Sequence, residues 1–106
     1  MPRFLKIAEK LIPNFAGIKY TSGDLAEGIK CLKPNRSIFL GADTILAGAL
    51  VLGFDSAIMT SLNIYPELSL QIIECIKNSD NTKALTLQRK LNDHIDTILK
   101  KGTLVL

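Results

Sequence analysis

The sequence is poor in the residues that build metal and redox sites, with no tryptophan, one histidine and two cysteines among its 106 residues. Cys31 and Cys75 fall within helical patterns and have no CxxC motif around them, so we expect structural thiols, with neither a disulfide nor a metal site. His94 lies between Asp93 and Asp96 in a charged helical stretch, where we expect a solvated side chain. The residues themselves indicate no metal and no other cofactor.

Strong charge and long apolar runs are also missing. Thirteen basic residues face ten acidic ones, and the basic residues are scattered along the chain, which argues against a nucleic-acid partner. The longest uninterrupted apolar stretch, 44–54, is far shorter than the roughly 20 residues of a membrane helix. Arg3 and Glu9 interrupt the N-terminal segment where a signal peptide would be apolar. We therefore expect no membrane partner and a cytoplasmic location.

The remaining composition is that of a folded domain. Hydrophobic residues make up 47% of the chain and charged residues 22%, and the length suits one domain, 1–106, with its own core. Apolar spacing and turn residues predict helices and strands in alternation. The expected helices span 2–12, 24–33, 44–53, 66–78 and 80–102, and the expected strands span 15–20, 37–42 and 56–62. Strands alternating with helices predict an α/β fold with a parallel sheet.

Polar residues gather at the carboxyl ends of the expected strands. In the first strand Gly17 and Lys19 share a face, and in the second Phe39, Gly41 and Asp43 do so, because side chains alternate along a strand. Polar residues in these positions are typical of the active site of an α/β barrel. Three strands alone would leave both sheet edges open to water.

Three motifs carry a resemblance to a known family. GIKYTSGDL, FLGAD and GFDSAIMTSLN, in this order and spacing, resemble the N-acetylneuraminate lyase and dihydrodipicolinate synthase superfamily of pyruvate-dependent class I aldolases. The resemblance extends from about Phe4 to Gly102 and implies part of an eight-stranded β/α (TIM) barrel, about its sixth to eighth units, with an appended C-terminal helix. It also implies a homo-oligomer, usually a homotetramer, in the full-length family.

The resemblance implies a site and a reaction. The turn 21–24 is more similar to that of N-acetylneuraminate lyase, which cleaves N-acetylneuraminate (sialic acid) to N-acetylmannosamine and pyruvate. No cofactor is implied, because the substrate itself forms a covalent Schiff base with a lysine. The residues that match the family's positions are Lys19 for the Schiff-base lysine and Thr21, Gly41, Asp43 and Thr60 for the sugar-acid pocket.

One position departs from that pattern. Many sialic acid lyases have an acidic residue immediately after the aspartate of the second loop, whereas this chain has Thr44, which cannot accept hydrogen bonds as a carboxylate does. The sugar therefore stays open, and another pyruvate-dependent aldolase such as dihydrodipicolinate synthase is the alternative. Without the family's carboxylate-gripping motif and proton-relaying tyrosine, we expect the isolated chain to be inactive, which also fits a non-catalytic truncated isoform.

The chemistry makes a demand on Lys19. A class I aldolase needs a neutral amine as nucleophile, and an ordinary lysine is almost wholly protonated at neutral pH. We therefore expect Lys19 at the end of its strand in a partly desolvated pocket. The other residues have structural alternatives: Asp24 and Asp43 as helix caps, with capping favoured for Asp24, and Gly17 and Gly41 as positions where strands approach closely. Gly53 is expected to cap the C-terminal end of the helix 44–53.

Overall fold

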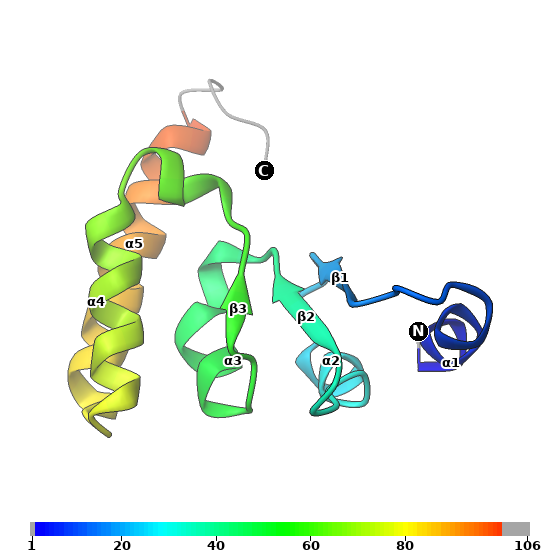
Figure 1. The fold of residues 1–106 in the computed structure, drawn as a ribbon. Coiled ribbons are helices and arrows are strands. Elements are labelled where there is room, and N and C mark those ends of the chain that lie inside the picture. The colour runs from blue at the N-terminus through cyan, green and yellow to red at the C-terminus, as the bar shows by residue number, and fades with distance from the viewer. Residues whose placement is uncertain (1, 101–106) are drawn as a thin grey trace.

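The computed structural model describes residues 2–100, which form a three-stranded parallel sheet with helices packed against it (Figure 1). The predicted α/β class is confirmed. In chain order the elements are α1 (Pro2–Leu11), β1 (Gly17–Tyr20), α2 (Leu25–Ile29), β2 (Ser37–Leu40), η1 (Asp43–Ile45), α3 (Leu46–Val51), β3 (Ser56–Ala57), η2 (Thr60–Asn63), α4 (Pro66–Lys77) and α5 (Asn81–Lys100).

The sheet has the order β1-β2-β3, so neighbouring strands in space are also neighbours in sequence. Lys19 pairs with Phe39 in the β1–β2 register, and Phe39 pairs with Ser56 in the β2–β3 register. Gly17 is required by the close approach of β1 and β2, because a Cβ atom there would collide with the carbonyl oxygen of Ser37. Between the two readings of Gly17, strand packing is the one that the structure supports.

The two faces of the sheet are covered very differently. Tyr20, Ile38 and Leu40 are buried and belong to the hydrophobic core, together with residues of α3, α4 and α5. On the opposite face, Lys19 is exposed and Phe39 is only half-buried. The alternation predicted from the sequence therefore holds, and Lys19 lies on the face that the helices leave open.

The helices begin and end largely where capping residues predict. Asp24 Oδ1 accepts a hydrogen bond from the Glu27 N–H at 3.0 Å and caps α2. Gly53 has a φ of 112° and ends α3 in a Schellman motif, with Phe54 N–H bonded to the Ala49 carbonyl at 3.0 Å. The predicted cap of 24–33 and the predicted glycine stop of 44–53 are both confirmed.

Several element lengths were predicted wrongly. α2 ends at Ile29 and not near residue 33. The N–H groups of residues 30–32 each donate to the carbonyl oxygen three residues earlier, which is the pattern of tighter, non-α-helical turns. The expected strand 56–62 keeps only Ser56–Ala57, since the chain turns into η2 where Asp43 binds the backbone of Ser61. The expected helix 44–53 opens with η1. Gly102, where the last helix was expected to stop, lies outside the described residues.

α4 and α5 pack along each other at one end of the molecule, and α1 lies at the other end beyond β1 (Figure 1). α1 buries Leu5 completely, and its Glu9 pairs with Arg36 and, at 3.5 Å, with Lys33. The hydrogen bond from Arg36, with the positive charges of Arg36 and Lys33, holds the pKa of Glu9 below its ordinary value. Residues 12–16 then run to β1 without forming a helix or strand.

Three predictions about single residues can be compared with the described part of the chain. Cys31 and Cys75 are buried and free, as expected. His94 is not a solvated surface side chain: it is half-buried with its ring centroid 4.8 Å from that of Tyr65, since α5 turns this side toward η2 and α4. No helix among residues 2–100 is long and apolar enough to cross a membrane.

Candidate active site

Lys19 and Gly41 lie side by side at the carboxyl edge of the sheet. Gly41 follows β2 and donates its N–H to the carbonyl oxygen of Tyr20 at 2.7 Å, which holds it against the end of β1. A Cβ atom on Gly41 would lie 2.9 Å from Lys19 Cε and 2.6 Å from Thr21 Oγ1. The Lys19 and Thr21 side chains thus occupy the space that any other residue at position 41 would need.

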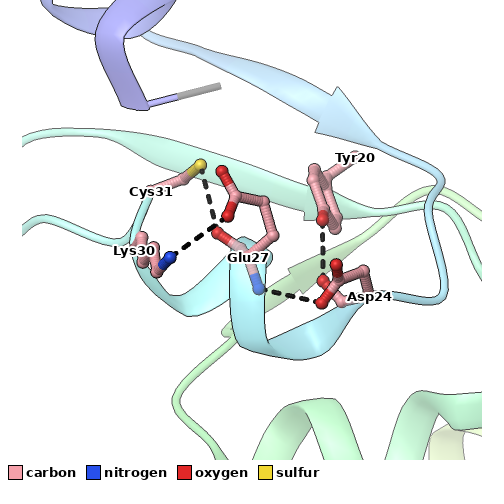
Figure 2. A network of polar contacts seen from close by, with 5 residues as sticks. All are labelled: Tyr20, Asp24, Glu27, Lys30 and Cys31. Atoms are coloured by element: carbon pink, nitrogen blue, oxygen red, sulfur yellow. Dashed lines mark hydrogen bonds and ion pairs between the residues drawn. The ribbon is translucent and has the colours of Figure 1, made fainter.

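The turn after β1 is fixed by the start of α2 (Figure 2). Tyr20 donates its hydroxyl to the carbonyl oxygen of Asp24 at 2.7 Å, and the Asp24 carboxylate caps the helix. Ser22 Oγ accepts from the Asp24 N–H at 3.0 Å, so it takes the place that Glu27 would hold in a full capping box. Asp24 therefore has the structural role that was favoured for it, and the turn that carries Thr21 has a defined path.

Asp43 is buried and joins the loop after β2 to the loop after β3. It is 5% exposed, and its Oδ2 accepts a hydrogen bond from the Ser61 N–H at 2.8 Å. Thr60, which is half-buried, is the residue immediately before Ser61. An aspartate in this position sets the relative position of the two loops, and a buried carboxylate is stable there because it is hydrogen-bonded to backbone.

The predicted residues therefore form two groups at one edge of the sheet. Lys19 and Thr21 both lie against Gly41, while the Asp43 carboxylate binds the residue that follows Thr60. The expected desolvation of Lys19 is wrong for the described chain, in which this side chain is exposed. Its face of the sheet lacks a covering layer, because the described helices bury the opposite face.

Three residues that were not predicted from the sequence form hydrogen bonds that hold the loops at this edge of the sheet. Gln88 and Asn92 of α5 bond to the backbone of η1 and the start of α3, and Ser61 supplies the N–H for Asp43. One signal could have revealed Gln88. It lies four residues after Ala84 and three before Leu91, in the buried stripe of the helix, where a polar side chain calls for a partner.

The chemistry available at this edge is that of a primary amine beside a small residue. Lys19 offers a nucleophile on a flexible stem, and Thr21 offers a hydroxyl near it. Among residues 2–100, no group of three or more histidine, cysteine or acidic side chains is arranged to hold a metal ion. The arrangement suits covalent attack of the amine on a carbonyl group.

The comparison with known families decides the relationship. The family model of the Dihydrodipicolinate synthetase family matches residues 4–106. The chain belongs to this family. The three parallel strands and their helices match part of the TIM barrel of the family, as the motifs GIKYTSGDL, FLGAD and GFDSAIMTSLN predicted.

Individual members of the dihydrodipicolinate synthetase family are similar over most of this chain. N-acetylneuraminate lyase from Fusobacterium nucleatum is 42% identical over 96 residues, which are 89% of this chain and 32% of that protein. The structure of N-acetylneuraminate lyase from Aliivibrio salmonicida matches with a TM-score of 0.89 and 31% identity, over 94% of this chain and 34% of that one. The F. nucleatum enzyme complexed with pyruvate matches with a TM-score of 0.86 and 36% identity, over 96% and 35% of the two chains.

These relatives are much longer than this chain. The chain spans about a third of the length of the relatives that it matches. Several of these relatives are named N-acetylneuraminate lyase, and one of them is known in complex with pyruvate.

Proposed function

We propose that this chain carries the Schiff-base part of an N-acetylneuraminate lyase site, with Lys19 as the catalytic residue. The observation that carries the proposal is the contact of Lys19 and Thr21 with Gly41 at the carboxyl edge of a parallel sheet. In the described part of the chain the Lys19 side chain is exposed, so a keto acid has access to the amine. A relative that is 36% identical is known in complex with pyruvate.

In the proposed reaction, the Lys19 amine attacks the C2 ketone of N-acetylneuraminate, and loss of water gives an iminium ion. The C4 hydroxyl loses its proton as the C3–C4 bond breaks, and the electron pair of that bond moves into an enamine through the iminium nitrogen. N-acetylmannosamine leaves as the aldehyde. The enamine then takes a proton at C3, and water releases pyruvate and restores the amine.

Thr21, Gly41, Asp43 and Thr60 are the proposed pocket residues. Gly41 leaves room beside the amine, and the threonine hydroxyls are able to donate and accept hydrogen bonds with a polyol. The Asp43 carboxylate accepts a hydrogen bond from the Ser61 N–H. This bond fixes the backbone next to Thr60 relative to the loop after β2. We further propose that the chain corresponds to about the sixth to eighth units of the family's barrel, and that it works without a cofactor.

The exposure of Lys19 affects the activity that we expect of the isolated chain. Schiff-base chemistry needs a lysine in a partly desolvated pocket, so we propose that efficient turnover needs a layer over this face of the sheet. The isolated chain is then inactive or nearly so, as a non-catalytic truncated form would be. A cytoplasmic location and a homo-oligomeric assembly also remain predictions.

The alternative within the same chemistry is an aldolase for a different aldehyde. The observation that favours it is Thr44, an exposed residue beside Asp43 at a position where a carboxylate would recognise sugar hydroxyls. Dihydrodipicolinate synthase is one such enzyme. Condensation assays with pyruvate and several aldehydes, among them N-acetylmannosamine, separate the two readings by which aldehyde is consumed.

Trapping tests the central step. The full chain is incubated with pyruvate and borohydride, and peptide mass spectrometry locates the reduced adduct. We expect the adduct on Lys19 and on no other lysine, none in K19R, and at least about tenfold slower formation in G41A, in which the added Cβ displaces Lys19 and Thr21. K77R, on the exposed side of α4, is the matched control and should react as the unmodified chain does. Absence of an adduct at high pyruvate would favour the non-catalytic form.

A further inference from the structure

Two side-chain amides of α5 reach across to the loop after β2. Gln88 Oε1 accepts a hydrogen bond from the Ala47 N–H at 2.7 Å, and Gln88 Nε2 donates to the carbonyl oxygen of Asp43 at 3.1 Å. Gln88 Nε2 also donates to Asn92 Oδ1 at 2.9 Å, and Asn92 Nδ2 donates to the carbonyl oxygen of Thr44 at 3.2 Å. We call Gln88 and Asn92 the amide bridge.

Gln88 is buried in a stripe where an apolar residue would be expected. It is 6% exposed and shares its side of α5 with Ala84, Leu91 and Ile95, which are all buried. A buried carboxamide is costly unless it is hydrogen-bonded, and here the oxygen and the amino group both have partners. Ala47 is the second residue of α3, where an N–H group has no acceptor within its own helix. Gln88 supplies that acceptor from another helix.

The amide bridge acts on the residues of the proposed pocket through their backbone. The loop that it holds starts after Gly41, which packs against Lys19, and contains Asp43, whose carboxylate binds the Ser61 N–H. Asp43 is thus held at two points, its carbonyl by Gln88 and its carboxylate by Ser61. A shift of α5 would move the second loop and the start of the third together, without moving Lys19.

We propose that the amide bridge positions the aldehyde end of the site, the part that receives a polyhydroxylated aldehyde, while the Schiff-base end is set independently by β1 and Gly41. This inference rests on the proposed function for the identity of the ligand. Gln88 and Asn92 are positioning residues, since these hydrogen bonds join them to the backbone of the second loop and to each other. α5 is therefore part of what gives this chain its selectivity.

The test compares Q88L with the unmodified full chain labelled with ¹⁵N. Leucine fills the space of Gln88 but removes its three hydrogen bonds, so amide hydrogen exchange at Ala47 and Ser61 should accelerate about fivefold to tenfold. The Gly41 amide, bonded to Tyr20 on the Schiff-base side, should change less than about twofold. Titration with N-acetylmannosamine, followed by the amide signals of Thr44 and Thr60, should show roughly tenfold weaker binding. Borohydride trapping of pyruvate on Lys19 should stay within about twofold.

Three further variants separate positioning from general loss of stability. Q71L makes the same replacement at an exposed position of α4 and should change nothing. L91A weakens the packing of α5 while it leaves both amides in place, so it should accelerate exchange throughout the chain and lower pyruvate trapping and sugar binding alike. Q88E keeps an oxygen that accepts from the Ala47 N–H but loses the amino group that donates to the Asp43 carbonyl. The exchange rate at Ala47 should therefore return to that of the unmodified chain, while sugar binding should stay as weak as in Q88L.

The possible results lead to distinct conclusions. Unchanged exchange at Ala47 and Ser61 in Q88L would overturn the inference, and so would equal losses of trapping and sugar binding, as in L91A. If the unmodified chain forms no pyruvate adduct, the proposed function fails. In that case the exchange measurements still decide whether the amide bridge holds the loop. If the unmodified chain does not bind N-acetylmannosamine, the assignment of the loop to that aldehyde is overturned.

Discussion

Two loops at the same edge of the sheet are held in opposite ways. The turn after β1 starts at Thr21, two residues after Lys19, lies in solvent, and is fixed by the short-range contacts of Asp24 at the start of α2. The loop after β2 has its aspartate, Asp43, buried and is bound by residues far along the chain, among them Gln88. The reactive amine thus lies on a strand next to a locally determined turn, whereas the loop after β2 depends on contacts with distant parts of the chain.

The flanking helices repeat this contrast. α5 is joined to the loop after β2 and to the start of α3 through hydrogen bonds of Gln88, and it buries Leu91 and Ile95 in the core. α1 is attached by Leu5, by an exposed ion pair of Glu9 with Lys33, and by an ion pair of the same Glu9 with Arg36, whose side chain is buried. Exposed ion pairs contribute little to stability, whereas buried and satisfied polar groups are costly to disturb. The two ends of the molecule should therefore respond differently to mutation and to pH.

The largest effect is expected from breaking the buried side of this comparison. D43A leaves the Ser61 N–H without its acceptor in a buried position and should lower the free energy of unfolding by about 2 kcal/mol. Urea denaturation followed by circular dichroism measures the loss. D43N retains an oxygen for the same N–H and should cost less than half as much. Equal losses in D43A and D43N would show that the charge of Asp43, and not the hydrogen bond to Ser61, is what matters.

A smaller effect is expected on the exposed side. D24A removes the side-chain cap of α2 and should lower the free energy of unfolding by about 1 kcal/mol, since the same kind of bond is made there in solvent. The same denaturation experiment applies. D24S keeps a capping oxygen and should recover most of the loss, so a cost in D24S as large as in D24A would argue against capping as the cause.

The smallest effect is expected from the ion pairs of α1, and it depends on pH. Because Arg36 lowers the pKa of folded Glu9 below its unfolded value, the stabilising contribution of Glu9 is present at neutral pH. It is lost as the pH falls through the lowered folded pKa. The stability difference between the unmodified chain and E9Q should therefore shrink between about pH 6 and about pH 3. A difference that stays constant over this range, or grows toward acid, would contradict the assignment to Glu9.

How much the sequence could predict follows the same division. Lys19 and Gly41 were predicted to lie at one edge because alternation along strands and parallel order place the strand ends there, and Thr21 was assigned to the same site by the family resemblance. Asp24 and Gly53 were predicted as caps because capping is decided within a few residues. These caps and strand ends were read correctly, although the end of α2, which is also local, was placed four residues too late.

Long-range hydrogen bonds account for what was missed. The expected strand 56–62 shortens to Ser56–Ala57 because Asp43, 18 residues earlier, binds the backbone of Ser61. The role of Gln88 depends on a loop 41 residues away in sequence. The exposure of Lys19 depends on which elements cover a face of the sheet, and periodicity within one strand carries no information about that.

The segment between α1 and β1 has a practical consequence. Pro13, Asn14 and Ala16 are exposed, and they join a helix attached partly by ion pairs to a strand bound within the sheet. A protease added to the folded chain should find its first cleavage site here. The larger product would retain all three strands and the helices that cover them, and would be the unit from which a minimal, crystallisable form of this chain is made.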